Sequence, residues 1–388
     1  AAHVVGHLET GRGGVMGLER VLDGRLAGGP LASSLDIRVQ QVLEEELAAG
    51  LAEYRAVAAW GVVLDAKTAE VVALASLPDF DPNSPGAAPP DWRRNRAVYD
   101  RYELGSALKA MTAAAAVEAG VASEASTYDA KASIRVADRV ISDFHPENRR
   151  LTFDEVMEHS SNVGMVIMAQ ALGAERQKAA LRALGLLDPL PIELAERRAP
   201  DAPAHWGPVE SATISFGHGI SITPLHLAAA YAAVVNGGEY RAPTFLKATD
   251  VRPGRRVFSE KTSATLRNAL RYVVTVGTGK AAEAAGYYPI GKTATAEKAK
   301  AGGYDRENRI TSFVGAFPGD APRYVVLVSF DEPKPTAKSA GYATAGWNAA
   351  PTFGRVVARI APQLGVMPVE NDPWAVAGAA PSVHGGAP

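Results

Sequence analysis

The chain has 388 residues, of which 47% are hydrophobic and 21% are charged, and its formal net charge at neutral pH is −2. This length allows two or three domains and a large buried core, and the near-neutral charge gives no reason to expect nucleic acid or an acidic membrane surface as a partner. Because the chain contains no cysteine, disulfides, thiolate metal sites and a cysteine nucleophile are excluded.

The first 30 residues are rich in glycine, which predicts a small accessory region of short strands and turns. His3 and His7 have the spacing of a helical zinc pair, but Val4 stands where the His-Glu-x-x-His motif requires glutamate, so the metal interpretation carries little weight. No apolar run in the chain approaches the about 20 residues that a membrane-spanning helix needs. The sequence starts at Ala1 rather than at methionine, so we expect a fragment or processed form whose signal or anchor lies outside it.

Apolar residues recur every three or four positions between residues 36 and 54, which predicts an amphipathic helix. Residues 60–64 and 71–76 are apolar runs on either side of a turn, and they predict a β-hairpin. A proline-rich loop follows and leads into a helix that carries Ser106 and is expected to stop at Gly120.

Further helices and strands are predicted in the second half of the chain. Thr223 is expected to cap a helix that has Pro224 at its first position and Gly237 at its end. Other helices are expected at residues 153–157, 162–172, 174–184, 259–275 and 351–364, and strands at 290–295, 310–317 and 324–330. With the early hairpin, the expected fold is therefore α+β, a five-stranded and mostly antiparallel sheet with helices on both faces. The tail, residues 367–388, is rich in proline, glycine and alanine and is expected to be disordered.

The segment around Ser106 carries the first candidate for chemistry. Residues three apart share one face of a helix, so the amine of Lys109 can lie beside the hydroxyl of Ser106. A serine hydroxyl attacks poorly until a base takes its proton, and lysine can be that base only where burial or nearby positive charge keeps it neutral. A serine and a lysine spaced in this way on a helix usually lie on a solvent-exposed face and have no catalytic role. Here the alanine-rich run 110–117 predicts a buried helix, in which a lysine would be costly without a purpose.

Two further motifs carry polar groups that could line a cleft. Ser160 and Asn162 form a Ser-x-Asn in which the hydroxyl could relay a proton and the carboxamide could grip a substrate amide, although the motif taken alone is better explained by a helix N-cap. Lys292 and Thr293 follow Gly291 in a run of small residues, which predicts an edge strand whose backbone NH groups could face a cleft.

In this order, the three motifs resemble the Ser-x-x-Lys, Ser-x-Asn and Lys-Thr-Gly signatures of the penicillin-interacting serine acyltransferases. The stretches 62–83, 95–109, 215–238 and 312–333 are similar to class B penicillin-binding proteins. Within that class, the Phe-Gly-His-Gly of residues 216–219 resembles the division-type (FtsI-like) septal peptidoglycan D,D-transpeptidases more than the elongation type. The resemblance runs from about residue 4 to residue 362.

The resemblance implies the penicillin-binding protein transpeptidase or serine β-lactamase-like fold and an enzyme that cross-links stem peptides in septal cell-wall synthesis. Ser106 would form an acyl-enzyme with the penultimate D-Ala of a stem peptide, and β-lactams would acylate it covalently. Lys109 would act as the base, Ser160 would relay the proton to the leaving amine, and Asn162 would bind the peptide amide.

The predicted edge strand would supply the remaining contacts of the site. Lys292, Thr293 and Thr295 would meet the terminal carboxylate of the substrate, and the backbone NH groups of Ser106 and Thr295 would form the oxyanion hole. One residue departs from the family pattern, because Ala294 stands where the signature has glycine. Its methyl group is added where substrate must approach closely, so we expect an active site that β-lactams acylate more slowly than a glycine version.

The resemblance also implies the organisation and surroundings of the protein. Residues 1–35 would be the C-terminal remnant of an N-terminal accessory (pedestal) domain, and residues 36–366 the transpeptidase domain. The implied partners are peptidoglycan stem peptides, β-lactams and divisome proteins including a membrane glycosyltransferase, with no cofactor, no metal and no nucleic acid. The full-length protein is expected at the periplasmic face of the inner membrane through an N-terminal anchor, and this fragment is expected to be soluble.

Two alternatives stay open. A serine β-lactamase or D,D-carboxypeptidase would use the same signatures, although no match to the deacylating-glutamate element of class A β-lactamases is present. A catalytically weak penicillin sensor or divisome scaffold is the other, because of Ala294. Two patterns carry less weight: residues 277–280 resemble only part of a phosphate-binding loop, and Asp143 with His145 lacks the Gly-x-Ser-x-Gly elbow of a serine triad.

Overall fold

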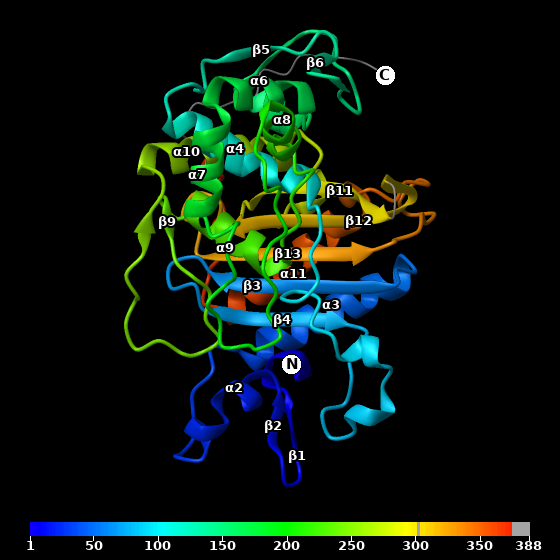
Figure 1. Ribbon diagram of the computed structural model, residues 1–388, viewed down its shortest axis with the longest axis vertical. Coiled ribbons are helices and arrows are strands. Elements are labelled where there is room, and N and C mark those ends of the chain that lie inside the picture. Colours follow the sequence, from blue (N-terminus) through cyan, green and yellow to red (C-terminus); the bar gives the residue numbers. More distant parts are fainter. Residues whose placement is uncertain (301–302, 375–388) are drawn as a thin grey trace.

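The computed structural model describes residues 1–300 and 303–374, and a five-stranded sheet lies at its centre (Figure 1). The strands follow the order β11 (Ile290–Lys300), β12 (Gly303–Phe317), β13 (Tyr324–Asp331), β3 (Ala58–Asp65) and β4 (Val71–Leu77). Every neighbouring pair is antiparallel. The expected five-stranded α+β architecture is confirmed, and β11 is an edge strand as predicted.

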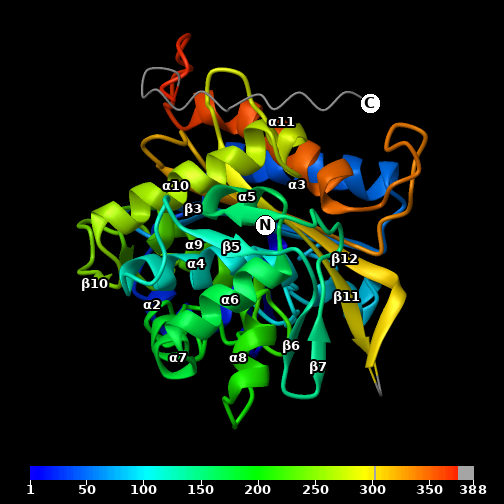
Figure 2. The ribbon, with the colours of Figure 1, turned by 90° about the horizontal axis from the view of Figure 1, so that it is seen from above.

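Helices cover both faces of this sheet (Figure 2). α3 (Ile37–Glu53) and α11 (Ala349–Gln363) pack against each other on one face, where they meet Val63 and Phe313. α9 (Pro224–Val235) covers the other face, where it meets Val62 and Leu64, and every residue of α9 is buried. Burial on both faces explains why β3 is apolar along nearly its whole length rather than alternating.

The remaining helices extend the α9 side into a second, helical part of the molecule. They are α4 (Lys109–Glu118), α5 (Phe153–Glu158), α6 (Asn162–Leu172), α7 (Ala174–Ala183), α8 (Pro208–Ser215) and α10 (Glu260–Thr275). Short two-stranded sheets decorate this part: β5 (Thr127–Asp129) with β8 (Arg150–Thr152), β6 (Ile134–Val136) with β7 (Arg139–Ile141), and β9 (Glu239–Tyr240) with β10 (Arg255–Arg256). One apolar cluster joins these helices to the sheet, so the two parts share a core. None of the helices in the described ranges is long and apolar enough to cross a membrane.

The N-terminal region differs from the expected strands and turns. It contains α1 (Ala2–Val5), a hairpin of β1 (His7–Glu9) and β2 (Gly13–Met16), and then a ten-residue helix, α2 (Gly17–Leu26). The high glycine content of this region favoured turns in the sequence-based prediction. The helix forms nevertheless, because Leu18 and Leu22 lie four residues apart and bury one helical face against Val4. The region therefore packs onto the main core through these apolar side chains.

Two further boundaries differ from the sequence-based expectation. β11 and β12 continue beyond Thr295 and Ile310 to form a longer hairpin than the apolar runs indicated. At the other end of the chain, Val369 N donates to Gly286 O at 2.9 Å and Tyr288 Oη donates to Glu370 O at 3.1 Å. The first residues of the expected tail are thus held against the domain, and its residues 375–388 lie outside the described residues.

Candidate active site

Ser106 lies on a short 3₁₀ turn, η3 (Gly105–Leu108), and α4 begins only at Lys109. The expectation that an α-helix carries the serine itself is therefore wrong, although residues three apart eclipse each other in 3₁₀ geometry and still share a face. Gly105 enters the turn with φ +51°, a conformation that favours glycine. Ser106 is partly exposed, whereas Ala107, Leu108 and Lys109 are buried.

Two contacts from the helical part hold this turn in place. Gly217 has φ +90°, and a Cβ there would lie 1.9 Å from Gly105 O, so only glycine permits this approach of two backbones. Tyr231 of α9 is fully buried and donates its hydroxyl to Ala107 O at 2.8 Å. Burial also raises the pKa of Tyr231, so its hydroxyl remains a donor at ordinary pH. Two different elements therefore pack closely against the backbone on either side of Ser106, and one of them binds Ala107 O.

Lys109 is fully buried and is surrounded by acceptors. Its Nζ donates to Asn162 Oδ1 at 2.7 Å and to Ser160 Oγ at 3.1 Å, and it also contacts Ser160 O. Burial lowers the pKa of Lys109 well below its usual range, and the charge of Lys292 lowers it further, whereas Asp143 raises it. The structure thus brings three of the predicted site residues together around one amine whose neutral form is favoured.

Ser160 and Asn162 occupy the start of α6. Ser160 has φ +57°, which is unusual for a residue with a Cβ and turns its hydroxyl toward Lys109. Ser161 is the N-cap of α6 and accepts from Gly164 N at 2.9 Å. The middle serine therefore caps the helix while Ser160 and Asn162 contact Lys109, and the roles of these two residues toward substrate stay predictions.

Asp143 is the residue of this site that the sequence reasoning missed. Its carboxylate accepts from Ser161 Oγ at 2.7 Å, from Asn162 N at 2.5 Å and from Val163 N at 3.0 Å. It thereby satisfies the first NH groups of α6 and complements the positive end of its dipole. Asn162 Nδ2 also donates to Ser142 O at 3.2 Å. No local pattern signals this role, because Asp143 lies 18 or more positions before its partners.

The opposite wall of the site is the edge strand β11. Lys292 is fully buried, and burial lowers its pKa to about 7. The one hydrogen bond of its Nζ within the described ranges is a long one, 3.4 Å, to Thr293 O. This amine therefore retains donor capacity that the described residues leave unused.

The side chains of Thr293 and Thr295 point to the other face of β11. Thr293 Oγ1 lies 2.6 Å from Thr278 Oγ1, and Thr295 Oγ1 accepts from Ala345 N at 3.1 Å. Thr278 belongs to the phosphate-loop-like stretch, which therefore supports β11. Ala294 is 3% exposed and lies in the apolar cluster that joins the sheet to the helices. Its methyl group faces the same side as Lys292, because side chains alternate along a strand.

The backbone of Thr295 faces the nucleophile turn. Thr295 O lies 3.7 Å from the position that a Cβ on Gly105 would occupy. The NH and C=O of one residue in an antiparallel strand point to the same side, so the NH of Thr295 also points off the sheet edge toward this turn. The arrangement places a strand NH opposite the backbone of Ser106.

Other candidate groups have contacts of a different kind. His3 interacts with Trp92 O at 2.6 Å and with Asp79 at 3.2 Å, and the described ranges contain no group of three or more potential metal-ligating side chains. His145 is exposed, and Asp143 binds α6 rather than this histidine, so the pair forms no triad. Burial lowers the pKa of His218, which lies in the Phe-Gly-His-Gly turn near the nucleophile.

The sequence of this chain is similar to a known protein family and to several of its members. A family model described as the penicillin binding protein transpeptidase domain matches residues 59–357. The chain is 42% identical over 383 residues to the probable peptidoglycan D,D-transpeptidase FtsI of Caulobacter vibrioides. This alignment covers 94% of this chain and 65% of the relative. It is 29% identical over 397 residues to the peptidoglycan D,D-transpeptidase FtsI of Escherichia coli, covering 95% of this chain and 66% of the relative. The chain thus spans slightly less than two thirds of these relatives.

Solved structures agree with these relatives. The structure of penicillin binding protein 3 from Mycobacterium tuberculosis, complexed with aztreonam, superimposes with a TM-score of 0.87 at 29% identity, covering 95% of this chain and 89% of that one. The apo transpeptidase domain of Burkholderia pseudomallei penicillin-binding protein 3 gives a TM-score of 0.78 at 30% identity, covering 87% and 97%. The shared fold includes the sheet and the helices that carry the candidate site.

Proposed function

Because the chain belongs to the penicillin-binding protein transpeptidase family, in its class B, FtsI-like branch, we propose that it is a serine peptidoglycan D,D-transpeptidase of septal cell-wall synthesis. The observation that carries the proposal is the buried Lys109 amine, which contacts Ser160 and Asn162 one turn after the partly exposed Ser106. A buried amine with a lowered pKa is suited to accept a proton from a serine.

The first half-reaction is acylation of Ser106. Its Oγ attacks the carbonyl carbon of the penultimate D-Ala, and its proton passes to the neutral amine of Lys109. The C–N bond to the terminal D-Ala then breaks, and Ser160 relays the proton to the leaving amine. The developing oxyanion accepts from the NH groups of Ser106 and Thr295, a contribution of roughly 3 kcal/mol per donor in comparable sites.

The second half-reaction transfers the acyl group. An amine from a neighbouring stem peptide attacks the Ser106 ester, loses its proton to Lys109, and forms the cross-linking amide while the serine oxygen regains a proton. Asn162 positions the substrate amide through its carboxamide. The protonated form of Lys292 binds the terminal carboxylate, and Thr293 and Thr295, whose side chains lie on the opposite face of β11, contribute through the strand that presents it.

The cellular location of the protein follows from its proposed substrate. Peptidoglycan lies outside the cytoplasmic membrane, so the active chain would work at the periplasmic face, held there by a segment outside the given sequence. By its resemblance to the family, the protein would have division proteins, including a membrane glycosyltransferase, as partners. Residues 1–35 would belong to the accessory domain that links the catalytic part to that anchor.

Covalent labelling tests the proposal. Intact-mass measurement after benzylpenicillin should show one stable adduct on the wild-type chain and none on Ser106→Ala. As a matched control, Ser142→Ala changes an exposed serine that contributes only its backbone carbonyl to the site and should label like the wild type. Absence of an adduct on the correctly folded wild type would favour the scaffold alternative, and rapid nitrocefin turnover would favour a β-lactamase.

A further inference from the structure

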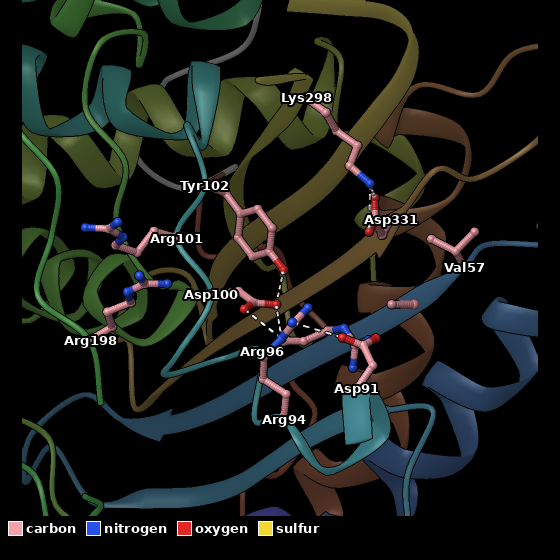
Figure 3. A pocket seen from close by; sticks show the side chains of 11 residues that line it. Val57, Asp91, Arg94, Arg96, Asp100, Arg101, Tyr102, Arg198, Lys298 and Asp331 are labelled. Carbon is pink, nitrogen blue, oxygen red and sulfur yellow. Dashed lines mark hydrogen bonds and ion pairs between the residues drawn. The ribbon is translucent and has the colours of Figure 1, made fainter. Parts of the chain in front are cut away.

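A charged cavity has a volume of about 420 Å³ and is lined by residues of the sheet and of the chain that precedes Ser106 (Figure 3). Its walls come from the loop that precedes the nucleophile turn, from the first residues of β3, from the ends of β11 and β13, and from Arg198. Five of its lining side chains are cationic and three are carboxylates: Arg94, Arg96, Arg101, Arg198 and Lys298 against Asp91, Asp100 and Asp331. The lining therefore carries an excess of positive charge.

Arg96 is the buried cation of this cavity. Its side chain is 6% exposed, and its Nη2 pairs with Asp91 at 2.5 Å. Its Nη1 is buried and has no hydrogen-bond partner in the part of the chain that the structure describes. A buried donor that stays unsatisfied costs free energy, so an acceptor that reached this group would be bound favourably.

Two arginines nearer the solvent also have donors to spare. Arg198 is exposed and lies 5.1 Å from the centre of the Tyr99 ring, and none of the described carboxylates forms an ion pair with it. Arg101 donates to Ala199 O at 3.3 Å, but its nearest carboxylate, that of the largely exposed Asp201, is 3.9 Å away. These two guanidinium groups can therefore receive an anion without breaking a close ion pair.

The other side of the cavity is rigid. The Tyr102 ring stacks on the buried Trp60 with 4.7 Å between ring centres, and its hydroxyl donates to Asp100 at 3.1 Å. Lys298 Nζ pairs with Asp331 at 2.9 Å and with Glu332 at 2.9 Å. These groups are already satisfied, so they shape the cavity while Arg96, Arg101 and Arg198 supply its free donors.

The cavity lies within one short peptide of the reaction centre. Lys298 follows Thr295 by three positions on β11, which corresponds to about 10 Å at the rise of an extended strand. Tyr102 precedes Ser106 by four positions on the loop that enters the nucleophile turn. About three extended residues of a substrate acylated at Ser106 would therefore reach the cavity.

We propose that this cavity binds a free carboxylate of a peptidoglycan stem peptide during cross-linking. The planar guanidinium fork matches a carboxylate in a bidentate arrangement, and three arginines from two separate segments of the chain line the cavity. The proposal rests on the proposed transpeptidase function. Donor and acceptor stems share this chemistry, so the test must tell them apart.

Binding to the unreactive Ser106→Ala chain tests the carboxylate directly. Two synthetic stem pentapeptides ending in D-Ala-D-Ala would be compared by calorimetry, one with its internal carboxylates free and one with them amidated. The free form should bind about tenfold more tightly, the size expected for one charge-assisted contact. Adding Arg198→Gln should remove that preference, whereas Arg182→Gln, which changes an exposed arginine of α7, should preserve it. Equal binding of the two peptides, or a preference that survives Arg198→Gln, would overturn the proposal.

Arg101→Gln serves as the second variant and should weaken the preference in the same direction. To identify which stem peptide supplies the bound carboxylate, the chain with Ser106 intact would first be acylated with benzylpenicillin, which occupies the donor position. A carboxylate preference that persists after acylation assigns the cavity to the acceptor stem, and one that disappears assigns it to the donor.

Benzylpenicillin acylation also separates the two levels of inference. The drug does not extend as far as a stem peptide, so its acylation rate should be equal in wild-type, Arg198→Gln and Arg101→Gln chains. Loss of acylation in the wild type would refute the proposed function itself. Normal acylation without a carboxylate preference would refute only the role of the cavity.

Discussion

The two walls of the cleft hold buried lysines in opposite ways. On the helical wall, Lys109 has acceptors from Ser160 and Asn162 at 3.1 and 2.7 Å. On the strand wall, Lys292 is equally buried but makes only one hydrogen bond, 3.4 Å long, within the described ranges. Protein acceptors thus surround the first amine, whereas the described residues offer the second no short hydrogen bond and leave it donors for a ligand.

This difference separates two tasks. The helical wall already holds the Lys109 amine against Ser160 and Asn162, and such positioning before substrate arrives favours catalysis. The strand wall keeps a buried cation short of partners, and a substrate carboxylate would complete it.

The largest effect is expected from Lys109→Met, which removes the base and keeps much of its volume. Benzylpenicillin acylation, followed by stopped-flow quenching, should slow by about a thousandfold, because general-base catalysis is typically worth 10²- to 10⁴-fold. The melting temperature should stay equal or rise, since a buried amine is costly and active-site groups are often suboptimal for stability. A large fall in melting temperature with acylation preserved would show that Lys109 is structural.

Lys292→Met tests the strand wall. Acylation should slow on the order of 10- to 100-fold, through loss of a charge-assisted contact to the drug carboxylate. The pH dependence of stability provides a second measurement. The pKa of Lys292 is about 7 in the folded chain, whereas an ordinary lysine has a pKa of 10.5. Between these two pH values the unfolded chain therefore binds more protons than the folded chain. The wild type should therefore gain stability as the pH rises from 7 toward 10, and the variant should gain less. Identical pH dependence of unfolding in both chains would contradict the lowered pKa.

Asp143→Asn tests how the helical wall is positioned. The carboxylate accepts three hydrogen bonds at the start of α6, and the amide cannot reproduce all of them. We expect acylation to slow about tenfold and the free energy of unfolding to fall by about 2 kcal/mol.

A charge readout separates this role from simple loss of packing. The Asp143 charge raises the pKa of Lys109, so its removal should move the acid limb of the acylation rate profile to lower pH. As a control, Asp138→Asn changes an exposed carboxylate of the nearby β6–β7 hairpin and should leave that limb in place. A limb that does not move in Asp143→Asn would reduce this residue to a structural support.

The contrast between the walls also shows what the sequence could predict. Lys109, Ser160 and Lys292 were identified because each belongs to a short motif whose spacing is local. The sheet was predictable for a similar reason, since a strand buried on both faces, such as β3, appears as an uninterrupted apolar run. Asp143 was not, because its partners are distant in sequence and meet it only through the packing of α6. The same holds for the cationic cavity, whose arginines come from separate segments.

Local patterns failed where glycine or tertiary contact decided the geometry. Helix α2 was hidden by the glycines around it, although Leu18 and Leu22 already had helical spacing. The 3₁₀ turn at Ser106 depends on Gly217 and Tyr231, which approach from the far part of the chain. Propensity alone favours a continuous helix there, and long-range packing overrides it.

The smallest effect is expected from Ala294→Gly, which restores the family glycine on the strand wall. Ala294 is 3% exposed and faces the same side as Lys292, so loss of its methyl should ease the approach of a β-lactam and raise the acylation rate about threefold. The free energy of unfolding should fall by about 0.5–1 kcal/mol, because glycine weakens a strand interior. Ala296→Gly is the matched control, since this residue is 4% exposed on the same face two positions further along. If both variants accelerate acylation equally, strand flexibility rather than the methyl of Ala294 limits the reaction. An unchanged rate in Ala294→Gly would mean that this methyl does not limit access to Ser106 at all.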